Sequence, residues 1–151
     1  MRFERKVKST SEAADNISPN SWVEATIHIN DSVEDITFPT SFWSENDYYA
    51  QWKDAISRIV ESPIDCKSAI FTEVHDIDAL DQSIGYWALY RRGDLVYVQD
   101  WAVPISYIKD VKRVDLAVLY DLVDDYEQGD STWELTVEDL KNFTRTIPAK
   151  T

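Results

Sequence analysis

Residues 41–63 have the pattern of a helix with a strongly aromatic buried face. Ser44 is a good N-cap residue, Asp47 falls at the third helical position, and acidic side chains in the first turn favour the helix dipole. Within one arc of about 100°, at roughly 3.6 residues per turn, lie Tyr49, Trp52, Ile56, Ile59 and Val60. Because Pro63 ends the pattern, we predict one main helix over about residues 45–61. Such a helix must bury its apolar face against another layer.

The aromatic side chains around this helix have two interpretations. Phe42 and Trp43 precede the helix, and Tyr48 and Tyr49 lie near its start, so the rings could form a ligand-binding box. Alternatively they pack: Tyr49 belongs to the apolar stripe, while Phe42 and Trp43 can pack around the point where the chain enters the helix. The stripe favours the second interpretation, and we predict that these rings are mainly core.

Much of the remaining chain has the two-residue period of β-strands. In "SWVEATIHIN", apolar and polar side chains fall on opposite faces, which predicts a half-buried strand, and "VEDITF" follows it. Later candidates are "KSAIFTEVH", "IGYWALYRR", "DLVYVQDWAV" and "STWELTV". Gly93 can form the hairpin turn between the second and third of these, and their two apolar faces predict central strands. Thr136 with Asp139 resembles a capping box that opens a short helix.

Together these elements predict an α+β fold. We expect a single domain with a mostly antiparallel sheet of about 5–6 strands, packed against the main helix and a short C-terminal helix. A chain of 151 residues suits one domain. Residues 1–20 are polar and aperiodic, which predicts a flexible tail before a domain at residues 21–147. Residues 109–130 are compatible with a short helix, an irregular strand or a loop.

The sequence offers little for catalysis or metal binding. The chain has two histidines, His28 and His75, and one cysteine, Cys66, none of them in a recognisable motif. Carboxylate pairs are expected by chance in so acidic a chain, and three glycines argue against phosphate-binding loops. We therefore predict no metal, no cofactor and no enzymatic activity.

Charge is the strongest global feature. The chain has 28 acidic and 15 basic residues, a formal net charge of −13, which disfavours nucleic acid and anionic membranes and favours a basic protein partner. The alternative is that this charge serves only solubility. Aromatic rings are interleaved with the acidic side chains at residues 110–139, as in an electrostatically steered interface. The predicted contacts are Tyr120, Asp121, Asp124, Asp125, Tyr126 and Glu127. The alternative for this segment is a solvated loop.

The sequence also bears on location. One cysteine cannot form an internal disulfide, which indicates a reducing compartment. The N-terminal segment lacks the apolar stretch of a secretory signal, and no apolar run reaches the ~18–20 residues of a membrane span. We therefore expect a cytoplasmic protein.

Three segments carry a family resemblance: "FWSENDYYAQWKDAISRIV", "WALYRRGDLVYVQDWAV" and "STWELTVEDLKNF". Over roughly residues 38–104 and 131–145 the chain resembles immunity proteins of bacterial contact-dependent growth inhibition systems. The resemblance implies a small cytoplasmic α/β protein that binds one cognate toxin domain, usually without enzymatic activity. Interface residues differ among family members, so the resemblance assigns no toxin-contacting residue in this chain. Many delivered toxins are nucleases, whose basic clefts an acidic inhibitor could cover.

Two other classes of function remain open from the residues alone. One is a cytoplasmic adaptor or regulatory protein that binds a different basic partner. The other is a small-molecule-binding or enzymatic domain that uses a tryptophan-rich sheet face as a pocket.

Overall fold

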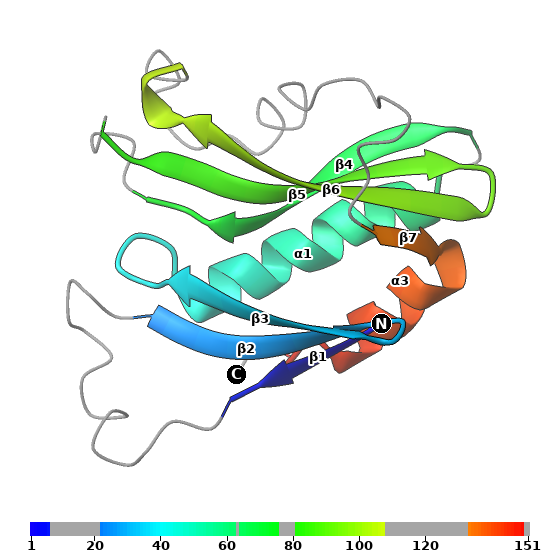
Figure 1. Cartoon of the computed structure of the whole chain (residues 1–151), viewed down its shortest axis with the longest axis horizontal. Coiled ribbons are helices and arrows are strands. Elements are labelled where there is room, and N and C mark those ends of the chain that lie inside the picture. The colour runs from blue at the N-terminus through cyan, green and yellow to red at the C-terminus, as the bar shows by residue number, and fades with distance from the viewer. Residues whose placement is uncertain (7–21, 63, 76–80, 108–132, 150–151) are drawn as a thin grey trace.

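The computed structural model describes residues 1–6, 22–62, 64–75, 81–107 and 133–149 (Figure 1). These residues form two antiparallel sheets with helices between them. The first sheet has the order β1-β2-β3, with β1 Arg2–Arg5, β2 Trp22–Ile29 and β3 Ser32–Pro39. The second has the order β4-β5-β6-β7, with β4 Cys66–Glu73, β5 Ser83–Arg92, β6 Leu95–Pro104 and β7 Trp133–Thr136.

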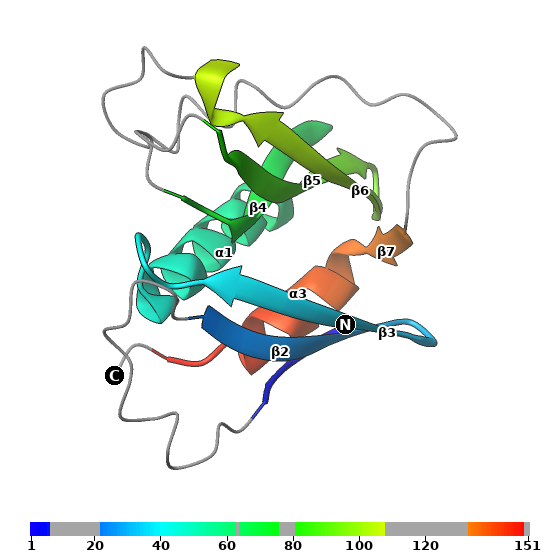
Figure 2. The same cartoon turned by 60° about the vertical axis from the view of Figure 1, so that its left-hand side comes forward.

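Helix α1, Glu45–Val60, lies between the two sheets, and α3, Val137–Thr146, follows β7 and packs beside α1 and β1 (Figures 1 and 2). A short 3-10 helix, η2, covers Ile105–Tyr107. None of the described helices combines the length and the apolar composition needed to cross a membrane.

The predicted main helix and its cap are confirmed. The Ser44 hydroxyl accepts a hydrogen bond from the Asp47 N–H at 3.2 Å, and the Asp47 carboxylate accepts one from the Ser44 N–H at 2.9 Å. Four members of the predicted stripe are buried: Tyr49, Trp52, Ile56 and Ile59. The buried face is wider than the stripe, because the helix meets a sheet on each side, and it also includes Tyr48, Gln51 and Ala55.

The aromatic side chains pack as a core, as predicted. Trp52 is fully buried, with its ring centroid 5.4 Å from those of Phe3 and Phe38 and 5.5 Å from that of Tyr49. Edge-to-face contacts of this kind stabilise a core beyond the apolar area that they bury. The predicted packing at the helix entry holds for Trp43, which contacts Tyr48 and Phe71, but Phe42 is 42% exposed.

The predicted strands and turns are also confirmed. Strand β2 alternates as expected, and its inward side chains Val23, Ala25, Ile27 and Ile29 are all buried. Gly93 joins β5 to β6 with a φ of 61°, which glycine adopts without strain. The second capping box opens α3, where the Thr136 hydroxyl accepts from the Asp139 N–H at 3.1 Å.

The α+β class is confirmed, but the strands form two sheets where the sequence suggested one. The free edge of β4 explains the division, because side chains of α1 hydrogen-bond to it in place of another strand. The Gln51 amide donates to the Ala69 carbonyl at 2.7 Å and accepts from the Phe71 N–H at 2.9 Å. The Trp52 indole donates to the Phe71 carbonyl at 2.7 Å. Strand β3 therefore cannot pair there, since those backbone groups are already bonded.

The predicted tail is wrong for Arg2–Arg5, which pair with β2 as strand β1. Phe3 is its one buried side chain and contacts Tyr49 and Trp52. A single inward residue between charged neighbours gives too little periodicity to reveal a strand. The rest of the predicted tail, residues 7–20, lies outside the described residues.

Candidate functional site

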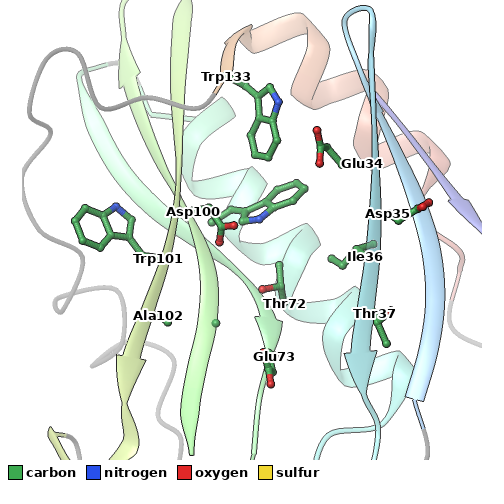
Figure 3. Close-up of a pocket in the computed structure, with 12 residues that line it drawn as sticks. Glu34, Asp35, Ile36, Thr37, Thr72, Glu73, Asp100, Trp101, Ala102 and Trp133 are labelled. Carbon is green, nitrogen blue, oxygen red and sulfur yellow. The ribbon is translucent and has the colours of Figure 1, made fainter.

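A cleft of about 450 Å³ lies between the two sheets (Figure 3). Its walls are the edge strand β3 on one side and strands β4, β5 and β6 on the other, with Trp133 at the start of β7. Acidic and aromatic side chains are prominent in the lining: Glu34, Asp35, Glu73, Asp100, Trp87 and Trp133.

The side chain of Tyr48 joins the two sheets. The Tyr48 hydroxyl donates a hydrogen bond to the Pro39 carbonyl at 2.7 Å, at the end of β3, and accepts one from the Val74 N–H at 3.0 Å, just after β4. Burial raises the pKa of this phenol well above its usual value, so it remains protonated and can donate. The two sheets are also joined by the Asn30 amide, in the turn before β3, which donates a hydrogen bond to the Glu134 carbonyl of β7 at 3.2 Å.

On β3, a carboxylate occupies a position of the inward face. Glu34, Ile36 and Phe38 alternate along this face, and Glu34 stands opposite Ile27 of β2. Ile36 and Phe38 are buried, whereas Glu34 is half-buried. Figure 3 shows Glu34 and Ile36 on the cleft side of β3 and Asp35 on the other side. The inward face of β3 therefore changes from apolar at Ile36 and Phe38 to acidic at Glu34.

On the opposite wall, the inward face of β6 also changes from apolar to acidic. Asp100 follows Val96 and Val98 on one face of β6 and stands opposite Trp87 of β5. Trp133 stands opposite Val98, and its ring centroid lies 4.9 Å from that of Trp87, with 52° between the planes. Trp87 is 6% exposed and Trp133 is half-buried. Two indole rings therefore lie beside the Asp100 carboxylate.

Two of the four carboxylates of the cleft have partners. Asp35 forms an ion pair with Lys6 at 3.1 Å and accepts a hydrogen bond from the Thr26 hydroxyl. These interactions lower the pKa of Asp35. Glu73 lies 2.8 Å from the His75 imidazole. These contacts lie at the outward face of β3 and at the end of β4, respectively.

The other two carboxylates, Glu34 and Asp100, form no hydrogen bond or ion pair with any residue of the described chain. Asp100 is exposed on β6, and desolvation by its neighbours raises the pKa of its carboxyl above the usual value. Among the described residues, the two acids thus give the cleft a negative charge without a paired base, and Trp87 and Trp133 line the same cleft. Such a site attracts a cation and repels an anion.

The described residues show no arrangement suited to metal binding or nucleophilic catalysis. No group of three or more His, Cys, Asp or Glu side chains in this part of the chain could hold a metal ion. His28 contacts Arg2 and Glu4, and His75 contacts Glu73. The Cys66 thiol lies 3.8 Å from the Arg58 carbonyl. Neither imidazole is therefore placed beside this thiol.

The six contacts predicted from the acidic segment, Tyr120, Asp121, Asp124, Asp125, Tyr126 and Glu127, lie outside the described residues. Trp133, near the end of the same acidic stretch, lies in the cleft. The sequence prediction missed Glu34, Trp87 and Asp100. A usable indication existed, because Glu34 and Asp100 each continue the apolar face of an alternating strand.

Comparison with known proteins identifies the family. Residues 38–143 match the CdiI N-terminal domain family, which is more than half of the chain. A search of curated proteins finds no significant match. One similar solved structure is a chain of a CdiA-CT/CdiI toxin and immunity complex from Enterobacter cloacae, with 18% sequence identity, 96% of each chain covered and a TM-score of 0.72. At this identity the likeness concerns the fold. The chain therefore belongs to the CdiI N-terminal domain family, in agreement with its resemblance to immunity proteins of contact-dependent growth inhibition.

Proposed function

We propose that the protein is an immunity protein that binds the C-terminal toxin domain of a delivered effector and neutralises it without catalysing a reaction. The family match over residues 38–143 carries this proposal. The solved structure of similar fold comes from a toxin and immunity complex, which supports it. The cytoplasm is the proposed site of action, because a delivered toxin must be met where it acts.

The proposed binding surface is acidic and its toxin partner is basic, with a nuclease as the favoured class of toxin. The net charge of −13 and the two cleft carboxylates that pair with no described residue support this part of the proposal. The acidic segment at residues 120–127 is a further proposed contact, supported by its alternation of carboxylates with tyrosines. Long-range attraction would speed the encounter of the two proteins.

The proposed function predicts a toxin gene immediately upstream of the gene for this chain, and the direct test uses the C-terminal domain that this gene encodes. Expression of that domain alone should stop growth, and co-expression with this protein should restore it. The two proteins should also co-purify as a stable complex, whereas a toxin domain from an unrelated system should be neither bound nor neutralised.

The proposal fails if the folded protein, checked by circular dichroism, neither binds this toxin domain nor protects against it. An adaptor protein with another basic partner would give that result. Restored growth without a stable complex would contradict neutralisation by binding, and would favour an enzymatic mechanism.

A further inference from the structure

We propose that the cleft between β3 and the second sheet receives one arginine side chain of the toxin domain and thereby anchors the complex. This inference rests on the proposed function and adds the chemistry of the contact. The residues that carry it are Glu34 on one wall, Asp100 on the other, and Trp87 with Trp133 beside them.

The first argument is the position of the two carboxylates. Glu34 and Asp100 each occupy an inward-facing position of a strand, where the preceding or following positions on the same face are buried and apolar. A carboxylate at such a position is stabilised by a cation, and the described chain supplies none to either residue. The structure thus has two negative groups on opposite walls of one cleft.

The second argument is the aromatic surface beside the acids. A cation placed against the face of an indole ring is attracted by the ring quadrupole, and tryptophan is the best of the aromatic side chains for this contact. The half-buried Trp133 ring packs against the buried ring of Trp87, with the two centroids 4.9 Å apart, so Trp133 is the ring available to a cation. An apolar anchor could use the rings but would leave both carboxylates unpaired, and an anion would be repelled by them.

Arginine fits this arrangement better than lysine. The guanidinium group is planar, so its face can stack on an indole while its N–H groups donate in the plane to carboxylates on either side. It is also more weakly hydrated than an ammonium group, so less hydration is lost when it enters a partly buried cleft. The cleft volume of about 450 Å³ is ample for one such side chain.

Described basic side chains near the two sheets have other partners. Arg5 pairs with Glu45, Lys6 pairs with Asp35, and Arg91 donates to the carbonyls of Ile59, Val60 and Ser62. We assign the occupant to the partner protein, whose basic character the net charge of this chain favours.

The test is the double variant Glu34→Gln with Asp100→Asn, titrated with the upstream-encoded toxin domain. We expect its Kd for the toxin to rise by at least about 30-fold, mainly through faster dissociation, because the toxin arginine loses both of its carboxylate partners in the cleft. Its urea midpoint should equal or exceed that of the wild type, since two carboxylates without partners are removed. The matched control, Glu24→Gln with Glu61→Gln, removes the same charge from exposed positions and should change the Kd by less than about threefold.

A second variant fills the cleft from within. Ala102 lines the cleft on the same face of β6 as Asp100, so Ala102→Arg places a guanidinium beside the carboxylates in the same chain. This variant should fold and should compete with the toxin arginine, so its Kd should also rise. Ala102→Gln is the uncharged control and should bind much as the wild type does.

A substitution series on the toxin identifies the partner residue. Replacement of one particular toxin arginine by lysine should weaken binding to the wild-type protein. The same replacement should change the Kd of the Glu34→Gln, Asp100→Asn variant very little. Unchanged affinity of this double variant, an equal loss in the matched control, or additive losses for every toxin arginine would each overturn the inference. Each of these three outcomes would contradict the inference even though the wild-type protein still binds the toxin and protects against it. Absence of wild-type binding would instead contradict the proposed function.

Discussion

Gln51 is the side chain whose replacement most directly tests how β4 is held. It is 2% exposed, and its amide bonds to two backbone groups of β4, the Ala69 carbonyl at 2.7 Å and the Phe71 N–H at 2.9 Å. Gln51→Met keeps the length and volume of the side chain but removes both hydrogen bonds. Each buried backbone group left without a partner costs about 1–3 kcal/mol, so we expect a loss of about 2–6 kcal/mol.

Equilibrium urea unfolding measures this loss. With a denaturant dependence of about 2 kcal/mol/M for a domain of this size, the midpoint should fall by about 1–3 M. Ser57→Ala, at an exposed position of the same helix, should change the free energy of unfolding by less than about 0.5 kcal/mol. A Gln51→Met variant within that margin of the wild type would refute the idea that this amide satisfies the edge of β4.

Gln51→Glu adds a test of the hydrogen-bond geometry. An ionised carboxylate can accept from the Phe71 N–H but cannot donate to the Ala69 carbonyl, whereas a protonated carboxyl can do both. Burial should raise the folded-state pKa of this acid above its unfolded value, so its stability should be highest below the unfolded pKa and should fall as pH rises. Stability of the Gln51→Glu variant that does not improve on acidification, relative to the wild type, would contradict the geometry.

Three further predictions concern the core, alkaline stability and binding. Trp52→Ala should lower the free energy of unfolding, measured in urea, by about 3–5 kcal/mol, and Arg58→Ala, at an exposed position, by well under ~1 kcal/mol. Equal, small losses for the two variants would contradict the buried stripe. Burial raises the pKa of Tyr48 and Tyr49 above the ordinary value of 10.0, so the stability that these phenols contribute is complete below about pH 10 and is lost above it; ultraviolet titration that shows both ionising near pH 10 in the folded protein would refute this. Neutralising the four carboxylates of residues 120–127 should slow association with the toxin and should weaken the fall of the association rate between about 50 and 500 mM salt. Unchanged association rates would exclude that segment as a contact surface for the toxin.

Local patterns account for the elements that the sequence predicted correctly. The cap at Ser44, the apolar stripe of α1 and the alternation of β2 all depend on neighbours within a few positions, so they can be read from one segment at a time. The β5–β6 hairpin is equally local, because Gly93 permits the turn between two adjacent strands.

The features that escaped prediction depend on pairs of distant residues. Strand β1 gains its stability from β2 and from the rings around Phe3, which lie tens of residues away in the sequence. The role of Gln51 requires the backbone of another strand, and its position on a helix does not reveal it. Glu34 and Asp100 face a common cleft only because two separate sheets bring β3 and β6 to its opposite walls.

The same helix accounts for both the two sheets and the cleft. Side chains of α1 bond to the free edge of β4, so β3 cannot extend that sheet, and the Tyr48 hydroxyl joins the two sheets near Pro39 and Val74. Beyond that bridge the inward positions of β3 and β6 border a cleft instead of a closed core, and there the strands carry acids in place of aliphatic side chains. Cleft residues such as Glu34 can therefore change with little effect on the aromatic core, which suits the proposed role of this cleft in matching one toxin.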